Sequence, residues 1–366
     1  MKEEELLYAL ALQRAKGIGD INAKKLIETC GSPKSVLKER KNTLSKINGI
    51  GAVLIKNLFD PECLKQAEKE LSFIRSNNIK PLYFQDKKYP NNLKNCIDGP
   101  FLLFQDGEFD FDNSNIISVV GTRNMTNYGR DFCKELISGL KDCNPTIISG
   151  FAYGVDICAH KAALDNGLQT IAVFAHGFDQ VYPKIHKKYM AKVYENGGFL
   201  TEFWSKETPL KENFLKRNRI VAGISQATVV IESAARGGSL ATATIANSYS
   251  RDVFALPGRS SDIYSKGCNN LIKTNKAALI TSADDLKEML GWTRQKQAKV
   301  IQPQLFVELT DDEQIIIDFL KQRQSELLDI IALDCGILVH KTASTLFQLE
   351  MKGLLKALPG KIFEIV

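Results

Sequence analysis

Glycines, hydroxyl groups and arginines gather at the ends of short apolar runs in the middle of this chain. The first such place is Gly121-Thr122-Arg123, which follows the β-branched run at 116–120 and precedes a helical pattern at about 128–140. A strand, a turn of small residues and a helix together present backbone N–H groups and a helix N-terminus to an anion. Arg123 adds a permanently charged fork that suits phosphate. Taken alone, the turn also fits an ordinary connection that carries a surface arginine.

Four further strand ends share this character. They are Ser149-Gly150-Phe151-Ala152-Tyr153-Gly154-Val155-Asp156 with His160, Ala175-His176-Gly177-Phe178-Asp179 with Tyr182-Pro183, Glu232 with Arg236-Gly237-Gly238-Ser239, and Pro257-Gly258-Arg259 with Gly267-Cys268-Asn269-Asn270. Small residues leave room for a ligand against the backbone, and unpaired N–H groups favour phosphate there. The counter-charge would come from Arg123 and from the basic segment Lys216-Arg217-Asn218-Arg219. We therefore predict a phosphate-bearing ligand at this face.

Each of these stretches also has an ordinary structural interpretation. Asp156 and His160 are four residues apart on a predicted helix, so they would pair with each other or cap it. His176 fits a structural role, Glu232 fits a cap of the next helix along the chain, and the basic segment fits a solvated face. Five strand ends and one basic segment all have the composition of a phosphate site. This agreement favours one shared ligand site over a separate structural explanation for each stretch.

The same edges hold no recognisable catalytic set. The sequence has no metal-ligand cluster, no Ser-His-Asp order that stands out and no G-x-x-x-x-G-K-[ST] loop. The first turn also lacks the full G-x-G-x-x-G fingerprint of dinucleotide binding. The sequence predicts a binder of phosphates with no catalytic residues, no metal and no cofactor.

These residues need a sheet whose strands all end at one edge. Short apolar runs alternate with helical stretches near 116–120, 146–149, 169–175, 198–201, 227–231, 252–256 and 278–280. Runs without polar alternation indicate strands buried on both faces, hence a parallel sheet with helices on each side. In such α/β folds ligands sit beyond the carboxyl ends of the strands. Further strands are expected near 82–84 and 101–104, followed by a polar linker at 106–115, so this domain spans 81–290.

Residues 1–80 form a predicted helical domain with two similar turns. Lys16-Gly17-Ile18-Gly19 and Asn48-Gly49-Ile50-Gly51 each sit between helical patterns. They resemble the helix-hairpin-helix (a SAM-like helical arrangement), whose Gly-apolar-Gly turn offers N–H groups to phosphate. Residues 1–90 carry 17 Lys/Arg against 11 Asp/Glu. The turns would either contact DNA or serve packing and contacts between proteins.

Residues 291–304 have the composition of a flexible linker, and 305–366 form a further small domain. Helical patterns near 311–324, 325–333 and 341–352 precede a hairpin at 354–357 and 361–365. Three helices and a hairpin make a winged helix, whose third helix would read DNA. That helix offers Lys341 and Lys352, in a segment with 6 Lys/Arg against 10 Asp/Glu. The acidic balance favours protein contact or regulation over DNA binding.

Composition narrows the class of protein. At 366 residues, 44% of them hydrophobic, the chain predicts two or three globular domains. Eight scattered cysteines without a C-x-x-C pair argue against a zinc site and predict reduced thiols. The acidic start differs from a signal peptide, and no apolar run approaches the length of a membrane span. We expect a cytoplasmic protein that does not bind membranes.

Taken in order, these stretches resemble the DNA-processing protein A family (DprA, also called Smf). The stretches that carry the resemblance are Val120-Gly121-Thr122-Arg123, Ser149-Gly150-Phe151-Ala152-Tyr153-Gly154-Val155-Asp156 with Ala159-His160, Phe178-Asp179 with Tyr182-Pro183, Arg217-Asn218-Arg219-Ile220-Val221-Ala222-Gly223, Gly237-Gly238-Ser239-Leu240-Ala241-Thr242-Ala243, Ala255-Leu256-Pro257-Gly258 and Gly267-Cys268-Asn269-Asn270-Leu271-Ile272. They follow the family's order, and the flanking domains fit as well.

The resemblance implies a Rossmann-like domain that binds single-stranded DNA in a basic pocket and is not an enzyme. It further implies a homodimer that protects incoming DNA and helps to load a RecA-type recombinase during natural transformation, in competence and recombination. Matched by position, the DNA-contacting residues are Arg123, Lys216, Arg217 and Arg219 for phosphates, and Gly121, Thr122, Ser149, Gly150, Asn218, Gly237, Gly238 and Ser239 for backbone or hydroxyl contacts.

Some details stay open within this resemblance. Phe151 or Tyr153 would stack on a base or belong to the core. His176 and Leu215 stand where the family often has a glycine and a proline, and both changes would reshape a loop. 

Two other functions compete with this interpretation. A related Rossmann-like family cleaves nucleoside monophosphates and carries P-G-G-x-G-T-x-x-E, of which Arg236-Gly237-Gly238-Ser239 is a partial echo without the glutamate. The second alternative is a duplex-DNA regulator that acts through residues 305–366.

Overall fold

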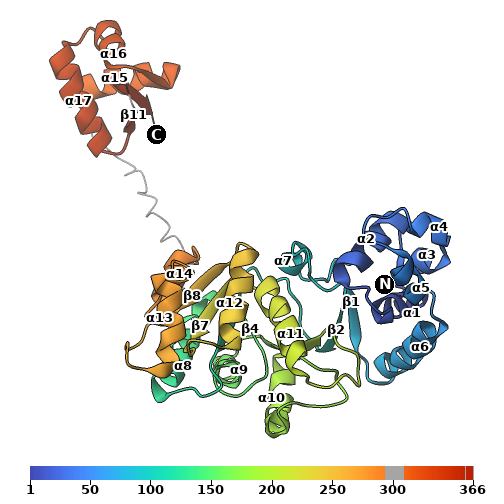
Figure 1. Ribbon diagram of the computed structural model, residues 1–366. Helices are drawn as coiled ribbons and strands as arrows, with labels where there is room; N and C mark the ends of the chain where they lie inside the picture. The colour runs from blue at the N-terminus through green and yellow to red at the C-terminus, as the bar shows by residue number, and fades with distance from the viewer. Residues whose placement is uncertain (293–308, 359, 366) are drawn as a thin grey trace. The chain divides into compact units, whose positions relative to one another are not determined.

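The computed structural model describes residues 1–292, 309–358 and 360–365 (Figure 1). The chain divides into two compact units, residues 1–292 and 293–366. The predicted linker at 291–304 lies outside the described residues from 293 onward. Its first two residues, Gly291 and Trp292, close the last helix of the first unit by donating backbone hydrogen bonds to Glu288 and Lys287.

A nine-stranded sheet forms the centre of the first unit, in the order β1-β2-β6-β5-β4-β3-β7-β8-β9. The strands from β6 to β9 along this order run parallel. They are β3 (Ile116–Gly121), β4 (Thr146–Ser149), β5 (Thr170–Val173), β6 (Gly197–Thr201), β7 (Ala227–Ile231), β8 (Asp252–Ala255) and β9 (Ala278–Leu279). The predicted α/β class and its parallel strands are confirmed. The strand order reverses between β3 and β7, which makes that edge the topological switch point.

Helices cover both faces of this sheet (Figure 1). They are α8 (Asn127–Gly139), α9 (Val155–Asp165), α10 (Met190–Glu195), α11 (Lys211–Ile224), α12 (Gly238–Ser248), α13 (Lys266–Lys273) and α14 (Ala283–Met289). Val119 packs in one buried cluster with Phe132 of α8 and Ala159 of α9. Its neighbour Val120 packs in another with Ile220 of α11 and Ala243 of α12. Successive strand residues face opposite sides, so both sides of β3 are apolar.

Two antiparallel strands join the sheet to the N-terminal helices. β1 (Lys80–Tyr83) pairs with β2 (Leu102–Gly107), and the short helix α7 (Asn91–Lys94) lies between them in the chain. The expected linker at 106–115 is wrong in its first two residues, because Asp106 and Gly107 pair with β6.

The N-terminal helices share one apolar core with the sheet. They are α1 (Glu3–Arg14), α2 (Asp20–Cys30), α3 (Pro33–Lys38), α4 (Lys41–Leu44), α5 (Ala52–Leu58) and α6 (Pro61–Ser76). Leu10 and Leu26 belong to the same buried cluster as Leu103 and Leu200, so the predicted domain 1–80 lies within the first compact unit. The two repeated turns have one geometry, since Gly17 and Gly49 have φ of +82° and +88° and each turn leads into a helix.

The described part of the second unit contains three helices and a three-stranded sheet. Its elements are α15 (Asp311–Arg323), β10 (Ser325–Leu327), α16 (Leu328–Asp334), α17 (Val339–Met351), β11 (Leu355–Leu358) and β12 (Ile362–Ile365). The expected helix at 325–333 is wrong at its start, because β10 pairs with β12 before α16 begins. Within the described ranges, no helix alone is long and apolar enough to cross a membrane; α16 and α17 meet that criterion only together, bent by 111°.

Candidate functional site

A cavity of about 650 Å³ opens at the switch point, beyond the carboxyl ends of β3 and β7. Its walls come from the β3–α8 and β4–α9 turns, from one face of α11 and from the start of α12. We call it the switch-point cavity. Nine of the twelve residues predicted to contact DNA line it: Gly121, Thr122, Arg123, Gly150, Arg217, Asn218, Gly237, Gly238 and Ser239. The structure therefore brings together most of a set that the sequence spreads over more than a hundred residues.

The β3–α8 turn forms one wall and is tied to β7. A Cβ on Gly121 would lie 2.0 Å from the carbonyl oxygen of Ile231, so this close approach requires glycine. The N–H of Thr122 donates to the carbonyl oxygen of Glu232 at 2.8 Å. Arg123 is exposed, and its guanidinium carbon lies 5.3 Å from the ring centre of Phe214. The turn thus holds one arginine at the cavity mouth.

The N-terminus of α8 is occupied by a carboxylate of the chain itself. The Glu232 side chain accepts from the backbone N–H of Thr126 at 2.8 Å and also from the Thr126 hydroxyl. Glu232 was expected to cap the next helix along the chain, α12. That expectation is wrong, because the carboxylate bonds the start of α8 instead. Dinucleotide-binding folds place their pyrophosphate at the start of the corresponding helix. An anionic cofactor would meet the negative charge of Glu232 there.

The N-terminus of α12, by contrast, opens on the switch-point cavity. Within the described chain, no side chain caps this helix at Gly237. Gly238 and Ser239 line the cavity, while Asn218 donates to the carbonyl oxygen of Gly238 at 3.3 Å. The first N–H groups of a helix lack partners within the helix and carry partial positive charge. They form a ready anion site.

Arg217 brings a buried positive charge to the same cavity. Its side chain donates from Nη1 to the carbonyl oxygen of Val173 at 2.6 Å, and its Nε has no partner in the described structure. Burial lowers the pKa of Arg217, and the nearby Asp156 carboxylate opposes that shift. Burial likewise raises the pKa of Asp156, which Arg217 opposes. A buried guanidinium with a free donor is best satisfied by an anion.

Gly150 is required by the approach of these two charged groups. A Cβ at this position would lie 2.3 Å from Arg217 Nη1 and 2.3 Å from Asp156 Oδ2. His160 holds Gly150 in place through a hydrogen bond, since its Nε2 lies 2.6 Å from the carbonyl oxygen of Gly150. A carbonyl only accepts, so Nε2 carries the ring proton, and Nδ1 lies 2.7 Å from Thr170 Oγ1.

The histidines hold the loops around the cavity. The expected pairing of His160 with Asp156 is wrong, because Gly150 and Thr170 engage both ring nitrogens, and Asp156 instead accepts from the N–H of Ala152 at 3.3 Å. Burial lowers the pKa of His160 to about 4. His176 accepts from the N–H of Tyr182 at 3.2 Å, which confirms its structural role.

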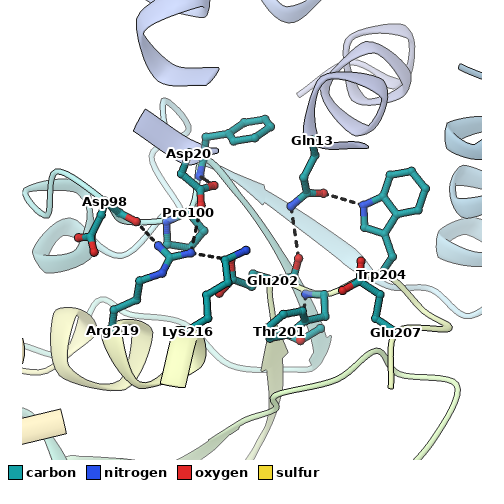
Figure 2. Close-up of polar contacts among 12 residues, drawn as sticks. Gln13, Asp20, Asp98, Pro100, Thr201, Glu202, Trp204, Glu207, Lys216 and Arg219 are labelled. Atoms are coloured by element: carbon teal, nitrogen blue, oxygen red, sulfur yellow. Dashed lines mark hydrogen bonds and ion pairs between the residues drawn. The ribbon is translucent and has the colours of Figure 1, made fainter. Parts of the chain in front are cut away.

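Three of the predicted DNA contacts lie outside the cavity. Ser149 is buried in the sheet and donates to the carbonyl oxygen of Val119 at 2.6 Å. Lys216 and Arg219 contact Glu202 instead, with their nitrogens 2.8 Å and 2.5 Å from Glu202 Oε2 (Figure 2). Their roles in binding DNA stay predictions.

Arg219 also reaches the N-terminal helices. Its Nη2 lies 3.0 Å from Asp20 Oδ2, and its Nη1 donates to the carbonyl oxygen of Asp98 (Figure 2). Burial raises the pKa of Glu202, and Arg219 and Lys216 oppose that shift. Because Lys216 and Arg219 are three residues apart, they share a helix face that is distinct from the face of Arg217.

Sequence reasoning placed Tyr182 at a strand end but assigned no binding role to the aromatic rings at the cavity mouth. Phe214 and Tyr182 line the cavity, and their ring centres lie 5.7 Å apart in an edge-on arrangement. The spacing of Phe214, Arg217 and Val221 along α11 places all three on one face, a signal that could have found Phe214. Lys211 and Arg236 add further positive charge to the lining.

The two residues suggested for base stacking have other surroundings. Phe151 is 3% exposed and packs with Phe174 and Phe199, so its core alternative is confirmed. Tyr153 is 46% exposed and lies edge-on to His186 outside the cavity lining. Across the part of the chain that is described, no group of three or more His, Cys, Asp or Glu is placed to hold a metal ion.

Relatives of the chain are known under several names. The DNA processing protein DprA of Streptococcus pneumoniae is 40% identical over 201 residues, which cover 55% of this chain and 71% of the relative. Protein Smf of Escherichia coli is 33% identical over 314 residues, which cover 81% of this chain and 83% of the relative.

Solved structures agree with these relatives. The X-ray structure of DprA from Streptococcus pneumoniae matches 77% of this chain and 97% of its own, with a TM-score of 0.67 and 32% identity. DNA processing protein A from Helicobacter pylori, solved for its single-stranded DNA binding mode, matches 58% and 96%, with a TM-score of 0.53 and 28% identity. The family model of DNA recombination-mediator protein A matches residues 80–291. The chain belongs to the DNA recombination-mediator protein A family.

Proposed function

We propose that this protein binds single-stranded DNA in the switch-point cavity and does not cut or modify it. The observation that carries the proposal is Arg217, a buried guanidinium whose Nε is unpartnered and which lines a cavity beside the open N-terminus of α12. A phosphodiester supplies the negative charge and the acceptor oxygens that both groups lack. The binding mode named for the Helicobacter pylori relative supports the same ligand.

The cavity mouth favours an unpaired strand over a duplex. Phe214 and Tyr182 present ring surfaces beside Arg123, and these three side chains could hold an unstacked base. Stacking on an aromatic ring contributes about 1–3 kcal/mol per base and needs a base that is free of its neighbours. A duplex keeps its bases stacked and exposes mainly phosphates to a recess of this kind.

The other parts of the chain extend this proposal. The matching turns at Gly17 and Gly49 support a helix-hairpin-helix arrangement in residues 1–80, within a SAM-like helical segment. We propose that the second unit, with α15 to α17 and the hairpin β11–β12, is a winged helix used for protein contact. Lys341 is paired with Asp312 and Lys352 with Glu313, while Phe347 of α17 is 61% exposed.

We also propose the cellular setting that the family name suggests. The protein would act in the cytoplasm as a homodimer, protect incoming single strands and help to load a RecA-type recombinase in natural transformation and recombination. The name DNA recombination-mediator protein A supports this setting. The basic balance of residues 1–300 and the acidic balance of residues 301–366 suit separate DNA-binding and protein-binding parts.

A competition titration tests the proposed ligand. Fluorescently labelled oligothymidylate is bound by the full-length protein and then displaced with unlabelled single strands or unlabelled duplex of equal length. We expect single strands to compete at least tenfold more effectively, and the affinity to fall steeply with salt. Equal competition by duplex would contradict the proposal.

The nucleotide-cleaving alternative makes a different demand on the site. Gly237 and Gly238 line the cavity, but the position where that family's motif has its glutamate holds Thr244. Incubation of the purified protein with nucleoside monophosphates should release no free base. Release of free base in proportion to the protein concentration would support the nucleotide-cleaving alternative and refute the non-enzymatic proposal.

A further inference from the structure

A second cavity, of about 290 Å³, lies between α2 and the residues at the end of α7. Three lysines line it, Lys24 and Lys25 from α2 and Lys94 from α7. We call it the lysine groove. Its lining also includes Glu28 and the exposed side chain of Ile97. Two segments separated by about seventy residues therefore bring their positive charges to one recess.

The positive charge of the lysine groove is poorly compensated. Lys24 Nζ donates to the carbonyl oxygen of Cys96 at 3.3 Å, and Lys25 Nζ donates to that of Asn48 at 2.8 Å. None of the ion pairs found in the described residues involves Lys24, Lys25 or Lys94. Burial lowers the pKa of Lys24, and the nearby Asp20 carboxylate opposes that shift only in part. Among the residues that line the groove, three lysines face one carboxylate, that of Glu28, so the lining itself keeps a net positive charge.

The lysine groove lies close to the switch-point cavity along α11. Asn218 lines the switch-point cavity, and Gly223 lies five residues further along the same helix. Five residues span about 7.5 Å of helix. Gly223 packs against the α7 segment, where a Cβ would lie 3.1 Å from Cys96 Sγ. A strand bound in the first cavity needs few further nucleotides to reach the second.

The groove also adjoins one of the repeated glycine turns. Lys25 bonds Asn48 in the turn that continues into Gly49, whose φ is +88°. Lysine ammonium groups bind phosphates as point charges and do not require a fixed base sequence. The position of the groove near the switch-point cavity along α11 favours a nucleic-acid strand over an acidic protein segment as the occupant.

We propose that the lysine groove is a second phosphate-binding site, which holds the same DNA strand where it leaves the switch-point cavity. This inference rests on the proposed single-strand binding. It assigns the N-terminal helices a direct contact with DNA through Lys24, Lys25 and Lys94. It also makes affinity depend on strand length, because short strands fill the first cavity without reaching the groove.

Length-dependent titrations test this inference. Full-length wild type and a Lys24→Gln, Lys25→Gln, Lys94→Gln triple variant are titrated with oligothymidylates of about 6 and about 25 nucleotides. We expect equal affinities for the short strand and at least a tenfold loss for the long one. The slope of log K against log salt for the long strand should fall by about 2, since each phosphate contact to a single strand contributes about 0.7.

A matched variant controls for charge. Lys38→Gln, Lys65→Gln, Lys69→Gln removes three exposed lysines of the same N-terminal segment that do not line the groove, and should bind both strands as wild type does. Unchanged affinity and salt slope of the groove variant for long strands would overturn the inference and point to an acidic protein occupant. Failure of the wild type to bind any single strand would instead refute the proposed function.

Lysine footprinting on the wild type gives a test that does not depend on a folded variant. Bound strands of about 25 nucleotides should protect Lys24, Lys25 and Lys94 from acylation, and strands of about 6 nucleotides should not. Modification that is unaffected by saturating long strand would refute a contact at the groove. Lys65 serves as the internal reference, because it lies outside both cavities.

Discussion

At the scale of single residues, the switch-point cavity depends on a tight arrangement of Gly150, Asp156 and Arg217. The glycine leaves no room for a side chain between the two charged groups. Arg217 is buried, lines the cavity and has no partner at Nε among the described residues. A phosphate that enters the cavity would meet a guanidinium that is already held in place, at little reorganisation cost. We therefore expect Gly150 to matter for binding as much as the arginine itself does.

Gly150→Ala should weaken single-strand binding without touching DNA directly. The new methyl group would overlap Arg217 Nη1 and Asp156 Oδ2, so the guanidinium must move. We expect at least a tenfold loss of affinity and a loss of about 1–3 kcal/mol in the free energy of unfolding, as for overpacked sites. Gly238→Ala is the matched control for stability, because nothing lies within 4 Å of a Cβ there. Binding by the Gly150 variant at wild-type strength would contradict this role.

His160 should make the first unit sensitive to acid. Burial lowers its pKa to about 4, against about 6.5 in an unfolded chain. Between these values the unfolded chain takes up a proton that the folded chain refuses, so the free energy of unfolding falls as the pH drops, by about 3 kcal/mol in total. Denaturant titrations at pH 7 and pH 4 should show a smaller fall for His160→Gln than for wild type. His340→Gln, at an exposed histidine, should fall as wild type does, and an identical fall in all three proteins would refute this assignment.

Residue types and their place at strand ends predicted most of the cavity lining, because the carboxyl ends of parallel strands meet at one edge. The same reasoning could not separate Arg217 from Lys216 and Arg219. Adjacent residues on a helix point in different directions, and the partner of each face becomes known only once β6 and the N-terminal helices are packed. His160 was misassigned for a similar reason, since its partner Thr170 lies on the next strand.

At the scale of elements, α11 works with two faces. One face carries Phe214, Arg217 and Val221 into the cavity. The opposite side is fixed by Glu202, which binds Lys216 and Arg219 and whose backbone accepts from Gln13 of α1 (Figure 2). The N-terminal helices therefore help to set the position of the helix that lines the switch-point cavity.

Glu202 and Lys216 should respond differently to substitution. Glu202→Ala removes a carboxylate that pairs with the buried Arg219. We expect it to lower the free energy of unfolding by about 3–5 kcal/mol. Lys216→Ala should cost less than about 1 kcal/mol, since its side chain is 51% exposed. Thermal or denaturant unfolding measures both. Equal costs would show that the buried carboxylate does not organise this contact.

The positions of the strands could be predicted closely from the apolar runs. The start of α15 is also encoded locally, because Thr310 and Glu313 form a capping box there. The strand β10 could not be predicted, because its three residues are too few to show a strand pattern and they precede a helical pattern. Its pairing with β12 is a tertiary contact that local sequence does not encode.

At the scale of the whole molecule, both cavities belong to the first compact unit. The sequence predicted a separate domain at 1–80 from its helical pattern, whereas the structure packs these helices and the sheet around one continuous apolar core. Helical periodicity shows that a face is apolar but does not show what covers it.

One measurement tests the central claim most directly: the affinity of full-length Arg217→Gln for a single-stranded oligothymidylate across a range of salt concentrations, beside wild type and Arg130→Gln. Arg130 is an exposed arginine of α8 outside the cavity lining. The account predicts a 10- to 100-fold loss for Arg217→Gln, about 1.5–3 kcal/mol for a charged hydrogen bond. Its salt slope should fall by about 0.7, and Arg130→Gln should bind as wild type does. A folded Arg217→Gln that binds with wild-type affinity and salt slope would contradict the account.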